Sequence, residues 1–221
     1  MGTTKQSKVT NMLLAGGMIA GPVYIGIGLV EGLTRKGFSF LHHDLSLLAN
    51  GHLGWIHSLL LVVSGMLTVA GAVGMRTVIR DSKGGTWGPL LLGLYGLGFV
   101  GAGIFKADPA NGFPIGTPAD AHAVSTAGLL HFVCGALGFV GLIAACFVLA
   151  RHFKAAKDTT WSKFSKVTGI FYLLAFLGIA MGSQQTGTVL TVVILGFTAA
   201  VILGWVWVTA TLGRLKHTAT N

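Results

Sequence analysis

The sequence predicts an all-α integral membrane protein, a single domain (1–221) built as a bundle of six transmembrane helices with both termini in the cytoplasm. Three observations predict it. Of the 221 residues, 52% are hydrophobic and only 10% are charged, whereas soluble domains carry about 25% charged residues. Apolar runs long enough to cross a bilayer as a helix recur along the whole chain. The basic residues lie mainly between these runs, where membrane topology signals occur.

Six apolar segments are predicted to span the membrane. Each must be a helix, because lipid cannot hydrogen-bond an unpaired backbone. No segment alternates with a period of two, so a transmembrane barrel is excluded. The first segment is longer than the apolar part of a secretion signal, about 7–15 residues, and is expected to remain as a span. The segments are 10–32, 53–75, 87–105, 123–150, 164–183 and 188–213.

Lysine and arginine are distributed unevenly between the two sides of the predicted membrane. One side, which includes both termini, carries twelve of them, and the other carries three, namely Arg35, Lys36 and Lys106. Because cytoplasmic segments hold the excess of basic residues, both termini are predicted to be cytoplasmic. This distribution accounts for the net charge of +9 without nucleic acid as a partner. The tryptophans near segment ends are predicted to anchor the interfaces: Trp55, Trp87, Trp161, Trp205 and Trp207.

Two long outer loops, 33–52 and 106–122, are predicted to fold as ordered caps over the bundle, because their Gly, Pro, Asn and Asp residues favour turns. The apolar stretch "LSLLA" (45–49) in the first loop is expected to lie in the membrane interface. The connection "QQTG" at 184–187 is so short that the last two helices must be antiparallel neighbours.

Glycine is abundant, with 34 residues. The stretch "GLGFVG" at 96–101 matches the spacing of a dinucleotide-binding fingerprint, but that fingerprint requires a turn between a strand and a helix. Here it lies inside a predicted membrane helix. Small residues let membrane helices approach closely, so these glycines are predicted to serve helix packing.

His57 and His131 are predicted to lie at a similar depth, a turn or two inside the second and fourth segments. At helical spacing, His57 shares a face with Ser64 and Thr68, and His131 shares one with Gly135. Small and polar faces point toward other helices, so we expect both imidazoles to face each other across a small, outward-opening cavity. Three roles stay open for the pair: packing hydrogen bonds, a pocket for a polar ligand or lipid headgroup, and a metal or haem site.

Two acidic residues lie near the same outer end. Asp108 directly follows the third segment and is placed to reach the cavity of His57 and His131, although an Asp-Pro pair also begins turns. Glu31, at the outer end of the first segment, is placed likewise, or pairs with Arg35 at the surface. The other polar residues of the first outer loop are expected to be solvated: His42, His43, Asp44 and His52.

Three stretches resemble a known family: "LTRKGFSFLHHDLSLLANGHLGWIH", "GIFKADPANGFPIGTP" and "STAGLLHFVCG". They are similar to the outer loops and the fourth span of the bacterial and archaeal membrane-protein family called domain of unknown function 998. The resemblance covers nearly all of the chain, implies six helices and gives no activity. Where a basic residue would be expected near the start of the sixth span, this chain has "SQQTGT". The family-pattern positions are Ser46, Asp108 and His131, with Gly112, Pro114 and Pro118 as turn residues.

The favoured function is a binding or accessory protein of the cytoplasmic (inner) membrane, with a small outward-facing polar pocket for a lipid, a small molecule or a partner. A partner membrane protein and a second copy of the chain are further candidate partners. Two alternatives are a metal-dependent hydrolase and a haem-binding electron-transfer protein, both using His57 and His131. The hydrolase hypothesis is weakened because the chain has no His-x-x-x-His pair, and the residues identify no cofactor. The candidate pocket residues are His57, His131, Asp108, Ser46 and Glu31.

Overall fold

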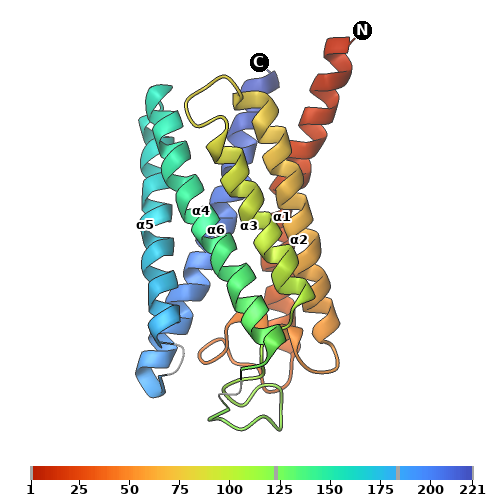
Figure 1. The fold of residues 1–221 in the computed structure, drawn as a ribbon, viewed down its shortest axis with the longest axis vertical. Helices are drawn as coiled ribbons and strands as arrows, with labels where there is room; N and C mark the ends of the chain where they lie inside the picture. The colour runs from red at the N-terminus through yellow and green to blue at the C-terminus, as the bar shows by residue number, and fades with distance from the viewer. Residues whose placement is uncertain (1, 122–123, 183–184, 221) are drawn as a thin grey trace.

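The computed structural model describes residues 2–121, 124–182 and 185–220. Within these residues it contains six α helices and no β strand, and each helix is long and apolar enough to cross a membrane. The predicted all-α architecture with six spans is therefore confirmed (Figure 1). The helices are α1 (Gly2–Thr34), α2 (Gly54–Ile79), α3 (Trp87–Ile104), α4 (Thr126–Ala155), α5 (Thr159–Gly182) and α6 (Gly187–Thr220).

Most helices extend beyond the predicted apolar segments, because an α helix satisfies its own backbone hydrogen bonds and need not end where the apolar residues end. The exceptions are the start of α4, which begins at Thr126, and, by one residue each, the start of α2 and the end of α3. Residue 123, where the fourth predicted segment starts, and residue 183, where the fifth segment ends, lie outside the described residues.

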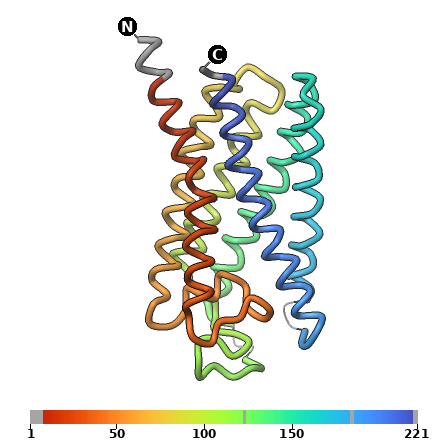
Figure 2. The backbone as a smooth tube through the Cα atoms, turned by 180° about the vertical axis from the view of Figure 1, so that it is seen from behind, coloured from red at the N-terminus to blue at the C-terminus, as the bar shows by residue number. Residues whose placement is uncertain are grey.

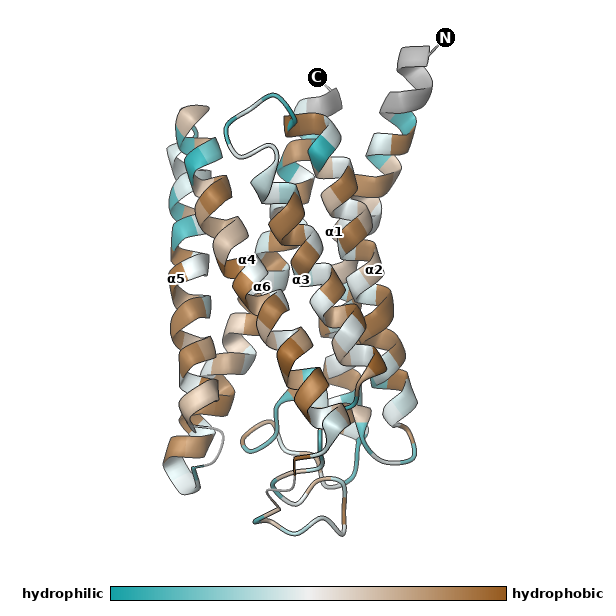
Figure 3. Ribbon diagram, in the orientation of Figure 1, coloured by the Kyte–Doolittle hydropathy of each residue, from teal (hydrophilic) through white to brown (hydrophobic). Residues whose placement is uncertain are grey.

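The helices alternate in direction and form a closed ring in chain order. Each helix packs against the next one along the chain, and α6 packs against α1 to close the ring. Both termini lie at one end of the bundle, and the two long loops lie at the other (Figures 1 and 2). Hydrophobic residues dominate the middle of the helices, whereas hydrophilic ones gather toward the end with the termini and in the loops (Figure 3). We call the end with the long loops the loop end.

Glycines bring α3 into direct backbone contact with its neighbours. A Cβ atom placed on Gly98 would lie 2.6 Å from the Cα of Gly138 in α4. One placed on Gly96 would lie 2.6 Å from the carbonyl oxygen of Gly65 in α2. The glycines of "GLGFVG" therefore serve helix packing, as the sequence predicted.

Four aromatic rings form the centre of the core. Tyr24, Tyr95, Phe99 and Trp205 pack against one another in edge-on or tilted contacts, with centroid separations between 4.9 and 5.4 Å. Trp205 is 0% exposed, and so is Trp207, whose indole N–H donates to the Ser165 hydroxyl at 2.9 Å. The prediction that these two tryptophans anchor the membrane interface is wrong. An indole needs one hydrogen-bond acceptor, and for Trp207 a serine of α5 supplies it in place of the interface.

The exposed tryptophans are those at the helix starts. Trp55 is 59% exposed and Trp87 is 65% exposed, so both remain placed to contact the membrane interface.

The first long loop folds inward. Its "LSLLA" stretch forms the 3₁₀ helix η1 (Leu45–Ala49), whose four apolar side chains are all buried in the protein. The expectation that this stretch lies in the membrane interface is wrong, because its leucines fill the loop end of the bundle instead. The Arg35 guanidinium donates to the backbone carbonyls of Leu48 and Asn50, at 3.1 and 2.5 Å, and thereby ties the end of η1 to the end of α1.

The two long loops are fastened to each other through His43. This residue is only 4% exposed. Its Nδ1 accepts the backbone N–H of Ser39 at 2.9 Å, and its Nε2 donates to the carbonyl of Asn111 in the second loop at 2.8 Å. The ring also packs against Phe113. The expectation of a solvated His43 is therefore wrong, and the described parts of the two loops contact each other through this residue.

A candidate ligand pocket at the loop end of the bundle

His57 belongs to a buried charged cluster between α1 and α2. Its side chain is fully buried, and its Nδ1 donates to Glu31 Oε2 at 2.8 Å. The other carboxylate oxygen of Glu31 lies 3.6 Å from the Arg35 guanidinium. Because Arg35 also holds η1, these three residues join two helices and the first loop into one unit. We call them the Glu31 cluster.

Asp108 fixes the start of α4. Its carboxylate accepts the backbone N–H of Ser125 at 2.9 Å and the Ser125 hydroxyl at 2.6 Å. That hydroxyl in turn accepts the backbone N–H of Gly128 at 3.0 Å, as a helix N-cap does. These contacts give Asp108 a structural role at the turn that leads into α4.

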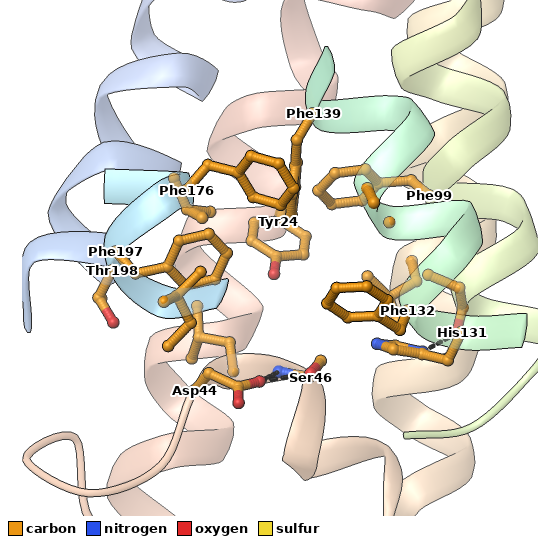
Figure 4. A pocket seen from close by; sticks show the side chains of 17 residues that line it. Tyr24, Asp44, Ser46, Phe99, His131, Phe132, Phe139, Phe176, Phe197 and Thr198 are labelled. Atoms are coloured by element: carbon orange, nitrogen blue, oxygen red, sulfur yellow. Dashed lines mark hydrogen bonds between the residues drawn. The ribbon is translucent and has the colours of Figure 1, made fainter. Parts of the chain in front are cut away.

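His131 is oriented by the end of α3. Its Nδ1 donates to two carbonyl oxygens, those of Ala102 and Phe105, each at 2.9 Å. These carbonyls lie in the last turn of α3, where backbone acceptors lack helical partners. With the proton on Nδ1, the Nε2 atom of a neutral ring carries a lone pair. This second nitrogen points into a cavity between the helices (Figure 4).

Asp44 and Ser46 form the polar edge of the same cavity. Asp44 caps η1, since its Oδ1 accepts the backbone N–H of Ser46 at 3.0 Å and also the Ser46 hydroxyl. Both side chains are half-buried and line the cavity. Asp44 was expected to be a solvated loop residue, but its side chain is half-buried because, as the N-cap of η1, it lies at the edge of the bundle.

The cavity has a volume of about 150 Å³ and is lined from all six helices and η1. One side is apolar, where the ring of Phe139 lies 5.6 Å from that of Phe176 and 5.4 Å from that of Phe197. The opposite end carries Asp44, Ser46 and His131 (Figure 4). Phe132 lines the cavity and is also 56% exposed, so the cavity reaches the outer face of α4. The full lining comprises Tyr24, Asp44, Leu45, Ser46, Leu61, Phe99, Ala102, His131, Phe132, Gly135, Ala136, Phe139, Phe176, Ile179, Phe197, Thr198 and Val201.

Comparison with known proteins settles the family. A family model described as a protein of unknown function, DUF998, matches residues 18–213. This chain belongs to the DUF998 family. Together with the six apolar helices, this membership makes the DUF998 protein an integral, multi-pass membrane protein. No curated protein and no solved structure matches the chain.

The structure brings together only two of the five sequence-predicted site residues of this DUF998 protein. Ser46 and His131 line the cavity, whereas His57, Glu31 and Asp108 do not. Tyr24 borders both environments, because it lines the cavity and its ring also lies 6.0 Å from the ring of His57. The expected cavity shared by both imidazoles is therefore not what the structure contains.

Several cavity residues of the DUF998 protein escaped sequence reasoning. The spacing of Asp44 and Ser46 fits a short turn in which an aspartate caps its own loop, and this signal could have identified Asp44. Tyr24 and Thr198 carry no such signal, because a lone polar residue in an apolar segment does not reveal which neighbour it faces. The phenylalanines lie in segments where core-facing and lipid-facing rings look alike.

Metal-binding groups are dispersed in the described part of the DUF998 protein. Within residues 2–121, 124–182 and 185–220, no three His, Cys, Asp or Glu side chains gather as a metal ligand set. One ring nitrogen of His57 is bonded to Glu31, and one of His131 to backbone carbonyls. Each ring therefore has one nitrogen left for another partner.

Proposed function

We propose that this protein is a binding or accessory protein of the membrane that takes up a single-chain amphiphile, a lipid or a lipid-like small molecule, in the cavity at its loop end. The observation that carries the proposal is that one cavity combines a wall of phenylalanine rings with a polar end formed by Asp44, Ser46 and His131. Ligand sites in proteins have this composition, mostly apolar with a few convergent polar groups.

The size of the cavity supports an amphiphile that is only partly enclosed. An apolar cavity of roughly 150 Å³ accommodates a group about the size of benzene. A polar end and its first few carbons fit such a space, whereas a whole lipid does not. The remaining chain would leave past Phe132, which lines the cavity and is exposed on the outer face of α4. In a membrane, that face of an apolar helix contacts lipid tails.

Membrane lipids are the proposed partners, and the cytoplasmic (inner) membrane is the proposed location. The location rests on the uneven distribution of basic residues, twelve on the side of the termini against three on the other. With this orientation the cavity lies in the outer half of the bilayer.

The hydrolase and haem hypotheses gain no support from the geometry of the described residues. A zinc enzyme needs three protein ligands around one ion, and no such group is found there. Paired axial haem ligands would have to share a space, but His57 does not line the cavity of His131.

Photocrosslinking tests the proposal. The protein is placed in phosphatidylcholine nanodiscs and exposed to sixteen-carbon chains that carry a diazirine and end in a hydroxyl, amine, carboxylate or phosphate. At least one of these probes should crosslink to residues that line the cavity, such as Phe139, Phe176 or Phe197.

A matched pair of variants makes the test specific. Gly135 lines the cavity, and a Cβ atom there meets nothing within 4 Å, so Gly135→Leu should fill the cavity and remove the crosslinks. Gly178 is equally open but does not line the cavity, so Gly178→Leu should crosslink as the native protein does. Crosslinking that is the same in both variants would overturn the proposal.

A further inference from the structure

We infer that the cavity selects an amphiphile whose polar end donates hydrogen bonds, a hydroxyl or an amine, and rejects ends that are anionic, such as a phosphate or a carboxylate. This inference rests on the proposed function and specifies the chemical class of its ligand. It follows from which hydrogen-bonding atoms at the polar end of the cavity are already used and which remain.

The first remaining atom belongs to Asp44. Oδ1 of this carboxylate already accepts the backbone N–H and the hydroxyl of Ser46. Oδ2 has no hydrogen bond or ion pair within the described residues; it is not among the buried side-chain atoms and remains accessible at the edge of the cavity that Asp44 lines. A carboxylate oxygen can only accept, so a polar group of the ligand beside Asp44 is favoured if it donates.

The second remaining atom belongs to His131. Because Nδ1 donates to the carbonyls of Ala102 and Phe105, Nε2 of the neutral ring is also an acceptor. It faces the cavity beside Phe132, away from the rings of Phe139 and Phe176 (Figure 4). Two acceptors from different parts of the chain, the N-cap of η1 and α4, therefore lie at one end of the cavity.

No basic side chain balances the carboxylate. The residues that line the cavity include neither lysine nor arginine. The one arginine at the first loop, Arg35, is bonded to the carbonyls of Leu48 and Asn50 and paired with Glu31. An anionic end would lose water and gain a like charge next to it, which is unfavourable on both counts.

The other polar groups of the cavity fit a hydroxyl or an amine. Tyr24 and Thr198 each carry a hydroxyl that can donate or accept. A ligand hydroxyl could donate to Asp44 or His131 while accepting from Tyr24. An ammonium group could donate to both acceptors and would be attracted by the carboxylate.

Competition between head groups tests the inference. The four unlabelled sixteen-carbon amphiphiles compete with whichever diazirine probe crosslinks most strongly in the nanodiscs. In the native protein, the alcohol and the amine should compete at concentrations at least about tenfold lower than the carboxylate and the phosphate, a ratio that corresponds to about 1.4 kcal/mol.

Replacing the carboxylate should reduce this selectivity. Asn caps helices as well as Asp does, so Asp44→Asn keeps the turn and removes the charge. In this variant, the concentrations at which the amine and the phosphate compete should lie within about threefold of each other, a difference of less than about 1.4 kcal/mol. As a control, Asp120→Asn removes one carboxylate charge from an exposed site in the second loop. It should leave the order in which the four amphiphiles compete unchanged. Should Asp44→Asn fail to fold, Ser46→Ala retains the carboxylate and must retain the preference for the amine.

The outcomes separate this inference from the proposed function. If none of the head groups gives crosslinks that Gly135→Leu removes, the proposed function fails. If crosslinks depend on Gly135 but the anionic ends compete as well as the others, only this inference is overturned. The inference is also overturned if Asp44→Asn folds and the amine still competes at much lower concentrations than the phosphate. Loss of the preference for the amine in Ser46→Ala would overturn it as well.

Discussion

His57 and His131 lie near the same end of the bundle, yet their hydrogen bonds give them different roles. His57 is bonded to a carboxylate inside the protein. His131 is bonded to backbone carbonyls and presents its other nitrogen to a cavity. A buried carboxylate needs its partners far more than a backbone carbonyl does, because an unpaired charge costs more to bury than an unpaired dipole. The two residues should therefore respond differently to substitution.

The Glu31 cluster should be sensitive to loss of its histidine. His57→Ala leaves the buried Glu31 with Arg35 as its ion-pair partner, at 3.6 Å. Removing one member of a buried pair typically costs about 3–5 kcal/mol, so the melting temperature in nanodiscs should fall sharply. His52→Ala, at an exposed position in the first long loop, should change stability by less than about 0.5 kcal/mol. Equal melting temperatures for the two variants would show that the cluster does not stabilise the fold.

At the scale of elements, α3 depends on glycine where it crosses α4. On Gly98, a Cβ atom would lie 2.6 Å from the Cα of Gly138 and 2.7 Å from the carbonyl oxygen of Cys134. Both are backbone atoms, which cannot rotate away as a side chain can. The close approach of the two helices at this point therefore excludes any larger residue.

Gly98→Ala should consequently destabilise the protein by about 1–3 kcal/mol, the usual cost of overpacking. A glycine of α6, Gly196, has nothing within 4 Å of such an added atom. Gly196→Ala should be neutral or stabilising, by up to about 1 kcal/mol, because alanine favours a helix. Thermal unfolding followed by tryptophan fluorescence distinguishes the two variants. If Gly98→Ala were as stable as Gly196→Ala, the close approach of α3 and α4 at Gly98 would be contradicted.

The two long loops act as one element because His43 joins them. His43→Ala removes the hydrogen bonds to Ser39 and Asn111 and the contact with Phe113. Loss of about 1–1.5 kcal/mol per hydrogen bond should speed amide hydrogen exchange roughly tenfold or more in both loops. His42→Ala changes an exposed neighbour and should leave exchange nearly native. Faster exchange in the first loop alone would mean that the loops fold independently.

For the whole molecule, the ring of six alternating helices places both termini at one end and both long loops at the other (Figure 1). The basic residues follow the same division, and this predicts that the end with the termini is cytoplasmic. The ring by itself is compatible with either orientation, since a bundle can be inserted both ways.

Cysteine labelling tests the orientation. In a variant without the free thiols of Cys134 and Cys146, a cysteine replacing the exposed Ala119 at the loop end should react with an impermeant maleimide in intact cells. A cysteine replacing the exposed Thr159, at the opposite end, should react only after permeabilisation. Labelling of the second cysteine in intact cells would reverse the predicted topology.

The sequence by itself determined the membrane class and the six helices. These features depend on local properties: runs of apolar residues, turn residues between them, and the inability of lipid to satisfy an open backbone. It also identified Ser46 and His131 as candidate pocket residues. The glycines of "GLGFVG" could be assigned to packing because their position inside an apolar run was visible in the sequence.

Only the tertiary structure decided which partners the polar and aromatic side chains have. The sequence predicted that Trp207 lies at the membrane interface, but its indole N–H donates to the hydroxyl of Ser165, 42 positions away. By sequence, His43 was expected to be a solvated loop residue, but it donates a hydrogen bond to the carbonyl of Asn111, 68 positions away. These pairings depend on how each helix is rotated and how the loops fold over the bundle. A residue's own neighbours in the chain do not specify such contacts, and for that reason the cavity, unlike the helices, could not be derived from the sequence.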